Sequence, residues 1–163
     1  MNLEKKYQVL LSEANKRQLP DIESIELCFM ALSLATHIDA DCAEQLAVHG
    51  LSEGRFILLF LLDAAEDGIA PKDLAEQVGI TRPTVTGLVD GLEREGLVER
   101  HADPEDRRAL KIQLTAKGKS IAKNVFEQHS RWIAKIFGNL TSQERQQFTQ
   151  LLAKVSNNLN NKE

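Results

Sequence analysis

The sequence predicts a mainly α-helical fold with one short β-hairpin, and three observations indicate it. Apolar residues recur at steps of three and four along most of the 163 residues. The period changes to two in one region, between about residues 97 and 114. Glycine, proline and capping residues stand where one periodic stretch gives way to the next. We therefore expect a row of helices with a single hairpin among them.

The first 50 residues predict two helices. A short helix ends before Pro20, and a longer one follows and ends near Gly50. The middle of the long helix, residues 27–35, is apolar on all sides except at Ser33. A helix of this kind is covered on more than one side, so we expect a second subunit to cover it.

A third helix is expected after Ser52, which can accept a hydrogen bond from the backbone of the following turn. Its apolar run, residues 57–62, fits a buried strand equally well by periodicity alone. The flanking charged residues, among them Glu53 and Asp63, favour a helix.

Two short helices follow, joined by a tight turn. Pro71 can open the first because no amide donor is needed at that position, and Gly79 ends it. Thr81 can cap the second, which has Pro83 in its first turn and ends at Gly96. Two helices at this spacing are typical of a helix-turn-helix.

The hairpin is predicted by residues 97–100 and 110–114, the second of which alternates strictly between apolar and polar. The polar segment between them contains Asp106, Arg107 and Arg108. An arginine on a narrow hairpin is shaped to enter a DNA minor groove, where the negative potential is greatest. The helix pair and the hairpin together predict a winged helix-turn-helix.

Two more helices are predicted, one from Lys117 to about Gly138 and one behind the capping box of Thr141 and Glu144. We therefore divide one compact chain into residues 1–50 (N-terminal helices), 51–116 (winged helix-turn-helix) and 117–163 (C-terminal helices). The winged-helix region with its flanking helices spans roughly residues 20–160.

The formal net charge of −4 argues at first against a nucleic-acid partner. The distribution argues otherwise. Residues 1–66 hold 11 acidic and 5 basic side chains, a net of −6, whereas residues 94–123 hold 8 basic and 5 acidic side chains, a net of +3. The basic segment coincides with the predicted hairpin.

The exposed face of the second short helix is expected to carry Arg82, Thr84 and Thr86, with Gly87 and Asp90 further along. Short hydroxyl and guanidinium side chains near a helix N-terminus reach base edges and phosphates in a major groove.

At these residues the sequence resembles the MarR family of bacterial winged-helix transcription regulators, over nearly its whole length. The matching motifs are Thr81-Arg82-Pro83-Thr84-Val85-Thr86, Leu92-Glu93-Arg94-Glu95-Gly96-Leu97-Val98-Glu99-Arg100, Asp103-Pro104-Glu105-Asp106-Arg107-Arg108-Ala109 and Leu114-Thr115-Ala116-Lys117-Gly118. One position departs from the family, because many relatives carry a basic or large polar residue where this chain has Gly87.

The resemblance implies a homodimer, with interlocked N- and C-terminal dimerisation helices, that binds a palindromic double-stranded DNA operator. It places Arg108 in the minor groove and the threonine-rich helix in the major groove. The implied DNA-binding residues are Thr81, Arg82, Pro83, Thr84, Thr86, Arg100, Asp106, Arg107 and Arg108. The implied output is a repressor released by a small aromatic or phenolic ligand, whose candidate pocket residues are Phe29, His37, Phe56, Phe60 and Trp132.

Two alternatives stay open: a regulator that senses oxidants through Cys28 or Cys42, and a winged helix that binds proteins. The two cysteines lie 14 residues apart, roughly 21 Å along one helix at 1.5 Å per residue, which excludes an intrachain disulfide. Cys28 lies in an apolar stretch and is expected in the core, and nearby Asp41 and Glu44 are expected to raise the pKa of Cys42.

Several functions are disfavoured. No catalytic constellation, phosphate-binding loop or metal-ligand spacing stands out, so we expect neither an enzyme nor a metal or cofactor. The longest apolar run, residues 56–62, is far shorter than the roughly 20 residues that span a membrane. No signal-peptide pattern opens the chain, so a cytoplasmic location without membrane attachment is expected.

Overall fold

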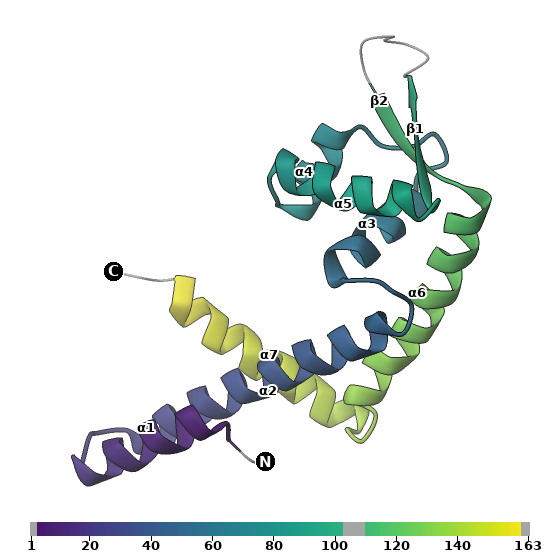
Figure 1. Ribbon diagram of the computed structural model, residues 1–163. Helices are drawn as coiled ribbons and strands as arrows, with labels where there is room; N and C mark the ends of the chain where they lie inside the picture. Colours follow the sequence, from purple (N-terminus) through teal and green to yellow (C-terminus); the bar gives the residue numbers. More distant parts are fainter. Residues whose placement is uncertain (1–2, 103–109, 161–163) are drawn as a thin grey trace. The chain divides into compact units, whose positions relative to one another are not determined.

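A computed structural model describes residues 3–102 and 110–160 of the protein. Within these residues it contains helices and one two-stranded antiparallel sheet (Figure 1). In chain order the elements are α1 (Lys5–Lys16), α2 (Ile22–Ala47), α3 (Glu53–Asp63), α4 (Pro71–Val78), α5 (Arg82–Arg94), β1 (Val98–Ala102), β2 (Leu110–Leu114), α6 (Ala116–Ile136) and α7 (Ser142–Asn160). The predicted mainly helical fold with a single hairpin is confirmed.

The chain forms two compact units, residues 1–57 and 58–163. In the first, α1 packs on α2. The Tyr7 ring stacks on Phe29 with 4.9 Å between centroids, and the Glu4 backbone N–H donates to the buried Ser33 hydroxyl at 3.3 Å. The single polar residue in the apolar middle of α2 therefore faces α1. Its apolar neighbours Leu27 and Leu32 remain exposed in the single chain.

The second unit has its core between α3, α4, α5, the hairpin and the N-terminal half of α6. The apolar residues of α5 recur at steps of four and three, so one face of the helix turns inward. Residues that are no more than 2% exposed are Leu58, Leu59, Leu62, Leu74, Val85, Val89, Leu92, Val98, Ile112 and Val125. The run 57–62 lies in α3, so the helical interpretation is correct and the strand alternative is wrong.

The turn between α4 and α5 forms as predicted. Pro71 is the first residue of α4, and Gly79 ends that helix at a φ of +71°, a left-handed conformation that glycine adopts without a Cβ penalty. The Thr81 hydroxyl caps α5 by accepting from the Thr84 backbone N–H at 3.3 Å. α4 and α5 therefore form a helix-turn-helix.

The hairpin has a defined register, in which Val98 faces Leu114 and Arg100 faces Ile112. Its first strand is Val98–Ala102, slightly later than the predicted residues 97–100. Ile69 pairs with Ile112 through two backbone hydrogen bonds of 3.0 and 2.9 Å. β2 therefore has backbone hydrogen-bond partners on both edges, β1 on one and Ile69 on the other.

The C-terminal helices also begin where expected. Thr115 caps α6 by accepting from the Gly118 backbone N–H at 3.0 Å. The capping box is confirmed, because Thr141 accepts from the Glu144 backbone N–H at 3.3 Å while the Glu144 carboxylate accepts from the Thr141 backbone N–H at 2.7 Å. The hydrogen bonds that the Glu144 carboxylate accepts from the backbone N–H and the hydroxyl of Thr141 lower the pKa of Glu144. None of the described helices is long and apolar enough to cross a membrane.

Candidate nucleic-acid interface

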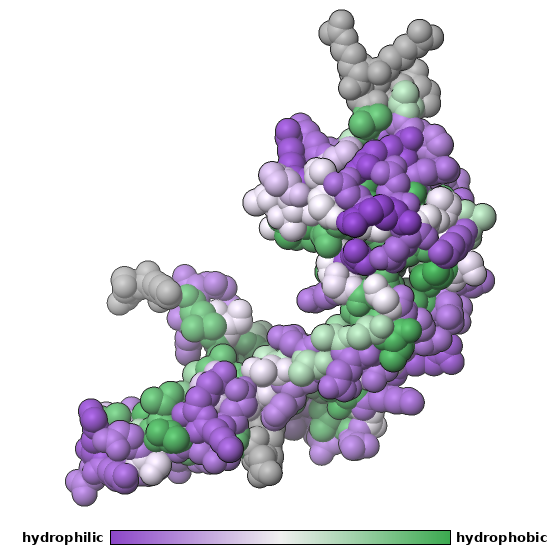
Figure 2. All heavy atoms as spheres, in the orientation of Figure 1, coloured by the Kyte–Doolittle hydropathy of each residue, from purple (hydrophilic) through white to green (hydrophobic). Residues whose placement is uncertain are grey.

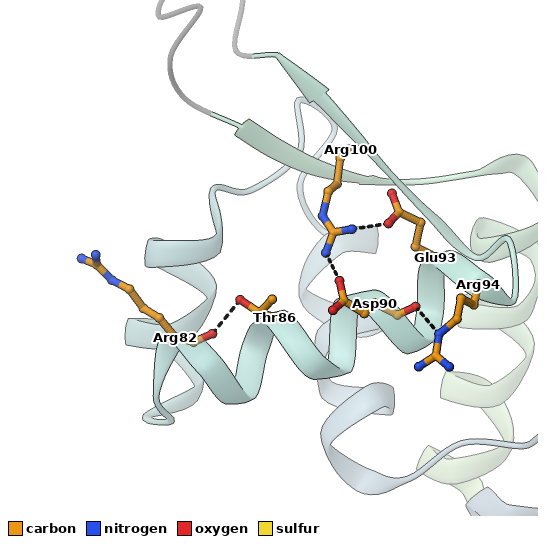
Figure 3. A network of polar contacts seen from close by, with 6 residues as sticks. All are labelled: Arg82, Thr86, Asp90, Glu93, Arg94 and Arg100. Atoms are coloured by element: carbon orange, nitrogen blue, oxygen red, sulfur yellow. Dashed lines mark hydrogen bonds and ion pairs between the residues drawn. The ribbon is translucent and has the colours of Figure 1, made fainter.

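The N-terminal half of α5 presents a polar, exposed face. Arg82, Pro83, Thr84 and Thr86 are all exposed. The Arg82 side chain extends away from the N-terminal end of the helix (Figure 3). Among the described residues the structure gives its guanidinium no ion pair, so its charge is available to an external anion. A helix N-terminus adds favourable potential for phosphate.

The threonines of this face are held by local hydrogen bonds. The Thr84 and Thr81 hydroxyl oxygens lie 2.8 Å apart, so Thr84 joins the cap of α5. The Thr86 hydroxyl donates to the Arg82 carbonyl oxygen at 3.0 Å. These hydrogen bonds fix the orientation of both hydroxyl groups, and both threonines remain exposed to solvent. The face combines one unpaired cation with ordered hydroxyl groups.

Arg100 lies in a different setting from Arg82. Its guanidinium forms ion pairs with the carboxylates of Asp90 and Glu93, both on α5 (Figure 3). Sequence reasoning placed Arg100 with the DNA-binding residues and missed the two acids as its partners. The available signal was their i, i+3 spacing, which puts both carboxylates on one face of a helix.

The predicted wing residues Asp106, Arg107 and Arg108 lie outside the described residues. The strands that lead to them are described. On β1, His101 lies 3.0 Å from the Glu99 carboxylate, an ion pair when the imidazole is protonated.

The predicted pocket residues are divided between the two units. Phe29, His37 and Phe56 belong to the first unit, whereas Phe60 and Trp132 belong to the second. The rings have contacts inside their own units: Phe29 stacks on Tyr7, Phe60 stacks on Phe126 at 4.6 Å and Trp132 lies 5.0 Å from His129. The hydrogen bond from Lys6 is the main cause that lowers the pKa of Glu4, and His37, which is exposed, is the smallest cause. The pocket stays a prediction.

The cysteines differ from expectation in one respect. Cys28 is exposed in the single chain, so its predicted core position is wrong; α1 covers the Ser33 side of α2 and leaves other faces open. Cys42 is half-buried, and burial raises the pKa of its thiol, with smaller contributions from Glu53, Asp39 and Asp41. The predicted direction is confirmed, but burial is the main cause. No cluster of three metal-ligating side chains occurs among the residues described.

The helix-turn-helix, the hairpin beside it and the exposed face of α5 together define a winged helix-turn-helix protein. A model of the MarR family matches residues 49–109. The transcriptional repressor YetL of Bacillus subtilis is 32% identical over 148 residues, which cover 90% of this chain and 89% of YetL. The transcriptional repressor MprA of Escherichia coli is 26% identical over 157 residues, which cover 96% of this chain and 89% of MprA.

Solved structures show the same fold. The Staphylococcus aureus MepR–DNA complex superposes with a TM-score of 0.67 at 23% identity, covering 80% of this chain and 96% of that one. The ligand-free MarR of E. coli gives 0.64 at 24% identity, covering 77% and 93%. The chain belongs to the MarR family. It is therefore a transcription regulator and not an enzyme.

Proposed function

We propose that the protein is a homodimeric repressor that binds a palindromic double-stranded DNA operator through α5 and the wing. The observation that carries this proposal is the exposed face of α5, where an unpaired Arg82 stands beside the ordered hydroxyl groups of Thr84 and Thr86. These side chains match the donors and acceptors of a major groove. YetL and MprA are named repressors, and MepR has been solved bound to DNA.

The C-terminal helix supports the dimer. α7 has no buried residue, yet it carries an apolar stripe at helical spacing whose side chains are 53–67% exposed. The stripe consists of Leu151, Leu152, Val155 and Leu159. Hydrophobic surface is visible along α7 and also along α1 and α2 (Figure 2). Exposed apolar stripes of this kind are stabilised when a second copy covers them, and a two-fold dimer matches a palindromic site.

The proposed operator is read in two grooves. Arg82, Thr84 and Thr86 would contact the major groove, with Thr81 and Pro83 setting the start of the helix. Residues 106–108 would contact the minor groove, with Arg108 inserted and Asp106 orienting a guanidinium. The basic balance of residues 94–123 favours this side of the protein for contact with phosphates.

Release would follow from binding of a small aromatic or phenolic ligand. A ligand shifts the equilibrium only by its preference for one state. Here it would prefer a dimer whose two α5 helices are wrongly spaced for successive major grooves. Half-exposed aromatic rings such as Phe60 and Trp132 offer stacking surfaces for such a ligand.

The test is selection from a pool of random duplex DNA with the full chain, followed by footprinting on the winning sequences and on the DNA beside its own gene. We expect a palindrome whose half-sites lie about one helical turn, roughly 10 base pairs, or a multiple apart. Addition of aromatic acids should then release the protein. Failure to enrich any sequence at low salt would favour a protein-binding winged helix instead.

A further inference from the structure

We infer that Arg100 is a positioning residue that fixes the direction of the hairpin relative to α5, and so sets how strongly the protein prefers its operator over other DNA. The inference rests on the proposed DNA-binding function. It adds the physical link between the two elements that would read the two grooves, and it replaces a direct DNA contact by Arg100.

The geometry of the link is bidentate. Asp90 and Glu93 lie one turn apart on α5, and their carboxylates reach toward the same guanidinium from β1 (Figure 3). Arg100 Nη2 donates to Asp90 Oδ1, and Nη1 donates to Glu93 Oε2. A planar guanidinium presents two donors in a fixed fork, whereas a lysine ammonium is a single point charge. The pair of contacts therefore restricts rotation of β1 against α5.

The position of Arg100 along the strand gives this link its effect. Val98 is 2% exposed at the start of β1, and the Arg100 side chain is 28% exposed, whereas His101 and Ala102 are exposed. Arg100 is the last residue of β1 for which the described part of the chain gives a side-chain hydrogen bond or ion pair with α5. A rotation at this point would redirect the outer end of β1, from which the chain continues to the proposed wing residues.

The charges argue for the same role. Asp90 and Glu93 lie on the helix that carries the proposed major-groove residues, where uncompensated carboxylates would repel phosphate. Arg100 offsets one of these two negative charges while it contacts both carboxylates. Their side chains are 49% and 38% exposed, and ion pairs this exposed add little to stability. Substitutions in the cluster should therefore leave the fold intact and alter DNA recognition.

A direct phosphate contact by Arg100 makes the opposite prediction. If Arg100 reached DNA, removal of the two carboxylates would free its guanidinium and remove repulsion, so that binding would strengthen. If Arg100 acts through the carboxylates, their removal should weaken operator preference although it makes the surface less negative.

The experiment compares four full-length proteins: wild type, Arg100→Gln, the double variant Asp90→Asn/Glu93→Gln, and the triple variant. Fluorescence anisotropy gives the affinity of each for a palindromic duplex selected by the wild type and for its scrambled sequence. We expect Arg100→Gln and the double variant each to lower the ratio of the two affinities about tenfold or more, comparable with the loss of one groove contact. The triple variant should have the same affinity ratio as Arg100→Gln, because the link is already lost once Arg100 is removed.

Three controls complete the design. Arg100→Lys should have the same low ratio of palindrome affinity to scrambled-duplex affinity as Arg100→Gln, because one ammonium cannot hold both carboxylates in a fixed plane. Arg131→Gln removes an exposed arginine of α6 that pairs with Glu127, and it should leave the ratio unchanged. Thermal unfolding of every variant should stay within about 4 °C of wild type, since exposed pairs are worth little.

The outcomes separate the hypotheses. The inference is overturned if Arg100→Gln has no effect, if Arg100→Lys restores full preference, or if Arg100→Gln weakens binding equally with and without the carboxylates. If the wild type binds no duplex, the proposed function fails and this inference fails with it. If the wild type prefers its operator but the effects of Arg100→Gln and of the double variant add up in the triple variant, the proposed function stands and only the positioning role of Arg100 is rejected.

Discussion

A β-carbon built on Gly118 would lie 1.9 Å from the carbonyl oxygen of Leu97. Gly118 is in the first turn of α6, and Leu97 immediately precedes β1, so this close approach joins α6 to the hairpin. Thr115 reinforces it by donating to the Gly96 carbonyl oxygen at 2.7 Å. The base of the wing is therefore packed backbone against backbone.

We predict that Gly118→Ala lowers the free energy of unfolding by about 1–3 kcal/mol, because a backbone carbonyl cannot move aside as a flexible side chain can. Urea unfolding followed by circular dichroism measures the change. Gly87→Ala is the matched control: nothing lies within 4 Å of its β-carbon, and alanine in a helix interior should stabilise by about 0.5–1 kcal/mol. A Gly118→Ala protein as stable as wild type would refute this packing.

The stripe on α7 leads to a prediction about assembly. Leu152→Glu combined with Val155→Glu should abolish the dimer, because two charges on each chain would have to be buried in an apolar interface. Light scattering after gel filtration should give a mass near the 18.2 kDa of one chain. Asn157→Glu, an exposed change on the opposite side of the same helix, should leave the mass at twice that value. A dimer that survives the double substitution would place the interface elsewhere.

Helix boundaries and the helix-turn-helix were predictable from the sequence because their signals are local. Proline at a helix start, threonine caps and glycine at a left-handed turn each act within a few residues, and Pro71, Gly79 and Thr81 all behave as expected. The strand-or-helix ambiguity of residues 57–62 was also settled correctly by the flanking charges.

Long-range relationships were less predictable. The i, i+3 spacing of Asp90 and Glu93 puts both carboxylates on one face of a helix, but it does not identify Arg100 as their partner, because that pairing depends on how β1 crosses α5. Cys28 shows a second limit: an apolar stretch signals burial without saying which chain provides the cover. The candidate pocket draws on aromatic residues of two units. Of the predicted DNA-binding residues that the structure describes, those at the start of α5 share one exposed face: Thr81, Arg82, Pro83, Thr84 and Thr86.

Arg82 is predicted to contribute directly to operator binding. Arg82→Ala should weaken operator affinity by about 1–3 kcal/mol for each lost contact, because its guanidinium is unpaired within the described chain and exposed. Gel-shift titration with the selected palindrome measures the loss. The control Arg131→Ala removes an exposed charge from α6 and should bind as wild type does. Equal affinities for Arg82→Ala and wild type would remove Arg82 from the interface.

Cys42 is predicted to be a slow nucleophile. Because burial raises its pKa, the thiolate fraction at neutral pH is below that of an ordinary cysteine and grows only as the pH rises through the higher value. In a Cys28→Ser background, alkylation by iodoacetamide at pH 7.5 should be slower than that of N-acetylcysteine and should still be increasing above pH 9. Alkylation as fast as the free thiol would revive oxidant sensing at this residue.

One titration shows whether the protein binds DNA sequence-specifically. The wild-type protein is titrated into the selected palindrome and into its scrambled sequence across a range of salt concentrations. We expect the palindrome to bind about 10³-fold or more tightly than the scrambled duplex at physiological salt, and both affinities to fall steeply as salt rises because phosphate contacts release counterions. Equal affinity for the two duplexes, or affinities that do not change with salt, would contradict this expectation.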